Sequence, residues 1–184
     1  ANGWTPLSRA VSSGRLDVVA FLLKKGADVD ENAERAYTPL MMAVIGNNPA
    51  MAKFLVDNGA DVNTRTGNGE TPLIWAAHNN NLEVTKFLVQ KGADISIKDD
   101  RGNTPLMRAA CMGSLDVAKF LVEKGADVNA KDDEGETPLG RIAGYDFCPG
   151  MVKFLVEHGA DVNAKSKNGR TPLRGQHCAA SGTR

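Results

Sequence analysis

Apolar and polar residues follow a helical spacing in short segments of this chain. Between residues 115 and 123, the only charged side chains are those of Asp116, Lys119 and Glu123. Because these residues are three and four positions apart, they share one narrow stripe of a helix, and every other position in the segment is apolar. A helix that is apolar on nearly every side cannot bury itself, so the pattern predicts neighbours of the same kind.

Local signals around this segment predict a pair of short helices. Thr104 suits the N-cap of a first helix, and Pro105 suits its first position. Gly113 and Ser114 interrupt that helix after about two turns, and we expect Ser114 to cap the second helix. Gly125 is the residue type expected where the chain turns left-handed after a helix.

Two sequence markers repeat in one register along the chain. Thr-Pro-Leu begins at residues 5, 38, 71, 104, 137 and 171, in steps of 33, 33, 33, 33 and 34. Gly-Ala-Asp begins at residues 26, 59, 92, 125 and 159, in steps of 33, 33, 33 and 34. The 184 residues are therefore expected to form a quasi-one-dimensional stack of five copies and one partial copy, without a single central core.

These markers and this period resemble the ankyrin-repeat family over residues 1–173. The resemblance implies an all-α solenoid of stacked helix-turn-helix units with projecting, β-hairpin-like finger loops. The fingers are expected at residues 28–37, 61–70, 94–103, 127–136 and 161–170. The expected copies are 1–29 (truncated at its N-terminus), 30–62, 63–95, 96–128, 129–162 (with a one-residue insertion) and the partial copy 163–184.

Two departures from the family pattern change the expectations. The family's usual histidine after Thr-Pro-Leu is absent, so its inter-repeat hydrogen bonds must be replaced or lost; the residues in its place are Ser8, Met41, Ile74, Met107, Gly140 and Arg174. Most finger tips end in glycine, which suits a turn with positive φ. The second finger instead has Arg35-Ala36, and we expect it to be reshaped.

The ends and the insertion leave alternatives open. The first copy begins within a finger, so we expect a piece of something longer; its second helix, 16–25, is as apolar as an internal one. That helix predicts either missing upstream structure or an exposed apolar end. The extra residue of the fifth copy lies within 144–149 and is either a tolerated loop insertion or a functional bulge. Residues 174–184 form either a polar cap or a truncated repeat.

Composition narrows the class of partner. Lys plus Arg and Asp plus Glu number 22 each, which removes a general electrostatic drive toward nucleic acid or a membrane surface. No apolar run approaches the roughly 18 residues of a membrane span. Three cysteines without framework spacing favour a reducing compartment, so we expect an intracellular, cytoplasmic monomer.

No set of residues predicts chemistry. His78 and Cys111 occupy equivalent positions, but side chains rooted about 8–10 Å apart meet at one zinc ion only with strain. No nucleophile–base pair or nucleotide-binding glycine motif occurs, so we expect no enzyme, cofactor or metal. The aspartates of Gly-Ala-Asp are expected to accept local backbone N–H bonds. One phenylalanine per second helix predicts a core ladder of Phe21, Phe54, Phe87, Phe120 and Phe154.

The informative positions are those that differ between copies on one face of the first helix. In the family that the chain resembles, this face lines a concave groove and the finger tips form its rim. The predicted rim residues are Trp4, Arg35, Tyr37, Asn68, Glu70, Arg101, Asn103, Glu134, Glu136, Asn168 and Arg170. The predicted partner-binding residues are Trp4, Arg9, Arg35, Tyr37, Met42, Ile45, Trp75, His78, Asn79, Arg101, Arg108, Met112, Arg141 and Tyr145.

We predict a non-catalytic module that binds a protein or peptide partner through this groove. The groove would have an apolar centre at Met42, Ile45 and Trp75. Its basic flanks would be formed by Arg9, Arg108 and Arg141. Aromatic residues, methionine and arginine are enriched in interface centres. Two alternatives remain. The large side chains could simply pack under their fingers, or the array could be a structural or targeting segment of a larger protein whose enzymatic activity lies elsewhere.

Overall fold

The computed structural model describes residues 4–32, 37–143 and 149–172, and this part of the chain contains ten helices and no strand. The all-α prediction is confirmed. The helices form pairs joined by short turns: α1 (Pro6–Ser12) with α2 (Leu16–Lys24), α3 (Pro39–Ile45) with α4 (Pro49–Asp57), α5 (Pro72–His78) with α6 (Leu82–Gln90), α7 (Pro105–Cys111) with α8 (Leu115–Glu123), and α9 (Pro138–Ile142) with α10 (Pro149–Glu157).

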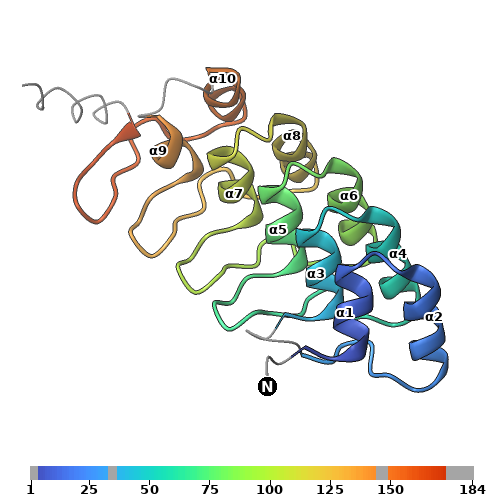
Figure 1. The fold of residues 1–184 in the computed structure, drawn as a ribbon. Helices are drawn as coiled ribbons and strands as arrows, with labels where there is room; N and C mark the ends of the chain where they lie inside the picture. Colours follow the sequence, from blue (N-terminus) through green and yellow to red (C-terminus); the bar gives the residue numbers. More distant parts are fainter. Residues whose placement is uncertain (1–3, 33–36, 144–148, 173–184) are drawn as a thin grey trace, which may run out of the picture.

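The pairs stack side by side in two layers (Figure 1). The first helices of the pairs, α1, α3, α5, α7 and α9, form one layer, and the second helices form the other. Long loops project from the stack between successive pairs, and they include residues 61–70, 94–103, 127–136 and 161–170, as predicted. The expectations for Arg35-Ala36, for the 144–148 insertion and for 174–184 fall outside the described residues.

Each first helix begins at the predicted threonine and proline. In the described copies the threonine Oγ1 accepts a hydrogen bond from the backbone N–H three residues later, and proline occupies the first turn. The second helix of the fourth pair ends before Gly125, which has a φ of 95° as the left-handed turn requires. Local signals therefore define both ends of the helices.

One predicted cap is wrong. Ser114 occupies the N-cap of α8, but its buried Oγ has no hydrogen-bond partner in the described part of the chain. Asn48 and Asn81 occupy the same position with a similar backbone, and their Oδ1 atoms accept from Met51 N (3.0 Å) and Val84 N (2.9 Å). The asparagine oxygen lies one bond further from the backbone than the serine oxygen, so only asparagine reaches the N–H group here.

The core is a continuous apolar layer between the two rows of helices. The leucine of every Thr-Pro-Leu in the described copies is at most 2% exposed; these leucines are Leu7, Leu40, Leu73, Leu106 and Leu139. They belong to one core cluster with buried residues of the second helices, which are Val19, Leu55, Leu88, Leu121 and Leu155. On α8 the exposed stripe is Asp116, Lys119 and Glu123, as predicted. Apolar burial between copies therefore holds the stack together.

The predicted phenylalanine core ladder is largely wrong. Phe21 is 59% exposed, Phe154 alone among the five is buried, and the other three are half-buried. Phe54, Phe87 and Phe120 each directly precede a fully buried leucine on their helix, so they are rotated from it by about 100° toward the edge of the outer layer. Lysine side chains cover some of the rings there; Lys91 Nζ, for example, lies 5.4 Å from the centre of the Phe87 ring.

The position of the absent histidine belongs to the core. Met41, Ile74 and Met107 are at most 1% exposed, and Ser8 is buried. Ser8 forms a reciprocal pair of hydrogen bonds with Thr5, which satisfies the start of α1 locally. Methionine and isoleucine make no such bonds, so at this position apolar packing takes the place of inter-repeat hydrogen bonding.

Asparagine side chains join each Gly-Ala-Asp turn to the next one along the stack, at the base of the fingers. Asn63 Oδ1 accepts from Asp94 N (3.0 Å), and Asn63 Nδ2 donates to Gly92 O (3.2 Å). Asn129 makes the same two bonds to the next Gly-Ala-Asp turn, at Asp161 N and Gly159 O. Ser96 occupies this position in the copy between them, and its hydroxyl donates to its own Asp94 at 2.7 Å. A hollow of about 240 Å³ lies beside Ser96.

We predict that Ser96→Asn stabilises the array. The new amide would donate to Gly125 O and accept from Asp127 N, which would raise the free energy of unfolding by about 0.5–1.5 kcal/mol for a net gain of hydrogen bonding. Urea denaturation followed by circular dichroism measures the change. The reverse exchange, Asn63→Ser, is the matched control and should lower the free energy of unfolding by a similar amount. An unchanged or lowered midpoint for Ser96→Asn would refute the prediction.

Candidate partner-binding groove

The predicted groove residues that the structure describes differ in how far they reach solvent. The side chains of Trp4, Ile45 and Met112 are exposed, with 47% of Met112 accessible. Met42 and Trp75 are half-buried and pack against the core. Two further predicted residues lie outside the described part of the chain: Arg35 and Tyr145.

The middle of the face is an aromatic pair. The ring centres of Trp75 and His78 are 5.4 Å apart, and their planes meet at 63°, an edge-to-face arrangement. The Trp75 Nε1 atom is buried and has no hydrogen-bond partner among the described residues. Trp75 therefore offers part of its ring to the groove and keeps its polar atom inside.

Asn79 has a structural role on this face. Its Nδ2 donates to Val44 O (3.2 Å) and Ile45 O (3.3 Å), the last carbonyls of α3. Val44 O also accepts from Asn47 N (3.0 Å) in the turn after the helix, and the Asn79 amide adds a cap from the following copy. The bond joins the second and third copies and leaves Asn79 only partly available to a ligand.

Arg108 is held by acidic groups of two fingers and does not form an open basic flank. Its Nη2 lies 2.8 Å from Asp99 Oδ2 and 3.2 Å from Glu70 Oε1. The Asp99 side chain is only 2% exposed, and that of Arg108 is 27% exposed. Arg108 therefore neutralises a buried carboxylate of its own copy, and its contact with a partner stays a prediction.

Arg141 repeats this arrangement in the fifth copy. Its Nε donates to Asp132 Oδ2 at 2.6 Å, and its Nη2 forms an ion pair with the same oxygen. Burial lowers the pKa of the Arg141 guanidinium, but the bond and charge of Asp132 more than offset this, so the net pKa is raised. Arg141 is therefore paired within its own copy, as Arg108 is, whereas Arg9 and Arg101 are exposed.

The two aspartates organise their fingers. Asp99 Oδ1 accepts from Arg101 N (2.9 Å) and Asn103 N (2.8 Å), and the Asn103 amide donates to the same carboxylate. Asn103 is 2% exposed, so its predicted place on the open rim is wrong. Burial raises the pKa of Asp99, but these hydrogen bonds and the one from Arg108 outweigh that effect and hold its pKa below the ordinary value of 3.8.

The sequence reasoning missed these aspartates, although a signal for them exists. Asp99 and Asp132 each precede their arginine by nine residues, whereas the third copy has Thr66 nine residues before Trp75. Arginine occurs where the finger has an acidic partner, and in the third copy both are absent together. The aspartates of Gly-Ala-Asp, in contrast, accept local backbone N–H bonds in all five copies, as predicted.

Backbone hydrogen bonds also join the finger tips. Asp100 N donates to Asn68 O, Asp133 N to Arg101 O, and Lys167 N to Glu134 O, at 2.9–3.1 Å. A Cβ atom on Gly102 would lie only 2.7 Å from Asp133 N, so a larger residue would push the fingers apart. The linked fingers form a continuous wall beside the first helices.

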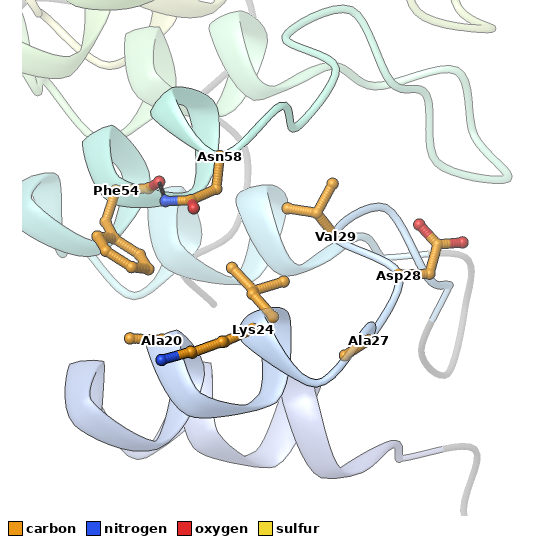
Figure 2. A pocket seen from close by; sticks show the side chains of 8 residues that line it. Ala20, Lys24, Ala27, Asp28, Val29, Phe54 and Asn58 are labelled. Atoms are coloured by element: carbon orange, nitrogen blue, oxygen red, sulfur yellow. Dashed lines mark hydrogen bonds between the residues drawn. The ribbon is translucent and has the colours of Figure 1, made fainter.

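A separate hollow of about 530 Å³ lies on the outer side, between α2 and α4 (Figure 2). Ala20, Lys24 and Phe54 line it, together with Asn58, whose Nδ2 donates to Phe54 O at 2.8 Å. None of the predicted partner-binding residues lines this hollow. The described residues include no group of three or more His, Cys, Asp or Glu side chains placed to hold a metal ion. Among the described helices, none is both long and apolar enough to cross a membrane.

Stacked helix pairs with linked fingers define a helical solenoid repeat protein. A family model described as ankyrin repeats (3 copies) matches residues 1–66 and 40–132, and a model described as ankyrin repeat matches residues 134–164. The chain belongs to the ankyrin-repeat family, which confirms the resemblance noted in its sequence. Repeats of this family are generally protein–protein interaction modules and are typically non-catalytic. A search of curated proteins finds no match to the chain.

We predict that Asp99→Asn destabilises the array at neutral pH by about 1–3 kcal/mol, because it removes the charge that faces Arg108. The pKa of Asp99 is lower in the folded protein than in the unfolded chain. The stability that this carboxylate contributes is therefore complete above its ordinary pKa and is lost as the pH falls through the lower, folded value.

Urea denaturation of both proteins between pH 7 and pH 3 measures this effect. The difference in the free energy of unfolding between wild type and Asp99→Asn should shrink below about pH 4. Asp116→Asn is the control, because that side chain is 74% exposed and pairs with Lys119 only at 3.7 Å. If this difference in the free energy of unfolding stays constant across the pH range, the stabilising role of the ionised Asp99 carboxylate is contradicted.

Proposed function

We propose that the array binds a protein or peptide partner through the face formed by the first helices and the finger wall. The observation that carries this proposal is the pair of exposed apolar side chains, Ile45 and Met112, on either side of the Trp75–His78 pair. These four residues come from the first helices of three successive copies and from the turn after one of them, and we expect them to form a patch across the stack. Exposed apolar side chains gathered on one face are typical of interaction sites.

The charges of this face divide into two groups. Arg108 and Arg141 neutralise finger carboxylates, so they support the shape of the groove and contribute little free charge to a partner. Arg9 and Arg101 are exposed and can steer an acidic segment toward the groove. Affinity would come mainly from burial of the apolar patch, and the exposed arginines would act mainly on the association rate.

The framework supports recognition by a preorganised surface. The fingers are joined to one another by backbone hydrogen bonds, and Asn79 joins the helices beneath them. A partner that binds to such a surface loses its own conformational freedom but does not have to order the array. A rigid, non-catalytic interaction module is the function that this arrangement supports best.

We predict that Met112→Asp weakens partner binding at least tenfold, because it places a charge in the apolar patch that the partner would have to desolvate. Val156→Asp is the matched control. Val156 is 43% exposed, close to the 47% of Met112, but it lies on α10 in the outer layer. A partner captured by the wild-type array is identified by mass spectrometry and then titrated against both variants.

Thermal unfolding of the two variants checks that each remains folded. Equal loss of binding in both variants, or full binding by Met112→Asp, would exclude this face as the binding site. A photo-crosslinking residue at position 45 supplies an independent readout, since it should label the partner, whereas the same residue at position 156 should not.

A further inference from the structure

A second feature of the first-helix side is a hollow between the first and second copies. Its volume is about 280 Å³, and it lies where the α1–α2 and α3–α4 turns meet. Serine, glycine and methionine residues border it together with one asparagine; the lining includes Ser12, Ser13, Gly14, Met42, Gly46 and Asn48. The corresponding place between the second and third copies is occupied by hydrogen-bonded asparagines, and comparison of the two places shows which groups the hollow leaves unpaired.

The hollow lacks the side-chain amide that caps the end of the first helix one copy later. Between the second and third copies, Asn79 Nδ2 donates to Val44 O and Ile45 O at the end of α3. One copy earlier, Gly46 stands in the position of Asn79. Val11 and Ser12 are the residues equivalent to Val44 and Ile45, and both border the hollow. Val11 O accepts a backbone hydrogen bond from Gly14 N (2.9 Å), so the Ser12 carbonyl and the second lone pair of Val11 O are the acceptors that have no amide cap from the second copy.

The hollow also contains a donor without an acceptor. Between the second and third copies, Asn81 Nδ2 donates to Asn47 Oδ1. One copy earlier, Asn48 stands in the position of Asn81, but Gly14 replaces Asn47. Asn48 Oδ1 accepts from Met51 N, while its Nδ2 lies 3.9 Å from the place where a Cβ of residue 14 would be. Among the described residues, this Nδ2 group has no hydrogen-bond acceptor.

We infer that this hollow receives a primary carboxamide, the side chain of a glutamine or asparagine in the partner segment that binds the groove. The inference rests on the proposed function and specifies the chemistry of the ligand. A carboxamide carries an N–H donor for the α1 carbonyls and an oxygen acceptor for Asn48. A carboxylate lacks the donor, and an ammonium group lacks the acceptor. The exposed Arg9, in the adjoining hollow lined by Trp4, Ser12 and Ser13, further disfavours a cation.

The test uses propionamide as the probe and the complete chain labelled with ¹⁵N. Propionate and propylammonium are the controls, because they have nearly the same shape but lack the donor or the acceptor. Propionamide should produce saturable chemical-shift changes at the backbone amides of Ser13, Gly14 and Gly46 and at the side-chain amide of Asn48. The two ions should bind at least tenfold more weakly. Equal shifts with all three compounds, or shifts that do not saturate, would overturn the inference.

A variant that fills the hollow from within supplies the second readout. In Gly14→Asn/Gly46→Asn both glycines become the residues found one copy later. The backbone suits this exchange, since Gly46 has a φ of −72° against −80° for Asn79, and Gly14 has 68° against 52° for Asn47. The variant should unfold at the same or a higher temperature and should lose propionamide binding at least tenfold. Retained binding would show that the probe sits elsewhere.

Asn48→Ser tests the donor separately. The fourth copy already folds with Ser114 in this position, so the variant is expected to remain folded. It should lose the preference for propionamide over propylammonium, and an unchanged preference would exclude Asn48 as the donor. These measurements need no partner protein. A failed propionamide titration would therefore leave the groove proposal standing, and a failed Met112→Asp experiment would leave the carboxamide site standing.

Discussion

Burial of apolar side chains between neighbouring copies is the interaction on which the rest of this protein depends. The first helices have at most seven residues, which is too short for a stable helix in water, so each persists only because its leucine packs against the next pair. The Thr-Pro-Leu leucines are almost fully buried in every described copy. Since each pair contacts only its neighbours, stability is distributed along the stack, and a change in one copy acts mainly on the two interfaces that the copy shares.

Polar interactions define the geometry within this apolar frame. With methionine or isoleucine in the position of the family's histidine, the inner core contributes packing but no inter-repeat hydrogen bond there. The joining polar bonds lie at the margins. Asn63 and Asn129 link the finger bases, Asp99 and Asp132 hold the finger loops and their arginines, and backbone bonds connect the tips. The fingers carry little apolar surface of their own, so they owe their order to these hydrogen bonds.

The success of the sequence predictions depended on the distance over which each signal acts. The threonine caps, the prolines and the Gly125 turn act within a few residues, and their helices begin and end where predicted. The Phe21 and Ser114 predictions failed because burial of a helix edge and the reach of a hydroxyl depend on three-dimensional placement. The arginines of the groove could have been interpreted correctly from the nine-residue spacing to Asp99 and Asp132, but that pairing becomes meaningful only once a finger is known to fold back over its own helix.

Comparison of equivalent positions in neighbouring copies separates the framework of this array from its ligand-facing groups. An arginine with an aspartate nine residues earlier belongs to the framework, and so does an asparagine that caps the helix of the preceding copy, because both satisfy buried polar groups of the chain itself. Ile45 and Met112 satisfy nothing within the chain, and their exposure costs hydration free energy in the unbound protein. The same reasoning applies to Gly14 and Gly46, where the framework side chains are missing and Asn48 is left without its acceptor. In a repeat protein, an interface between two copies can therefore lack a hydrogen-bond partner that the equivalent interface elsewhere has. A ligand that supplies this missing partner gains the most binding free energy at such a position.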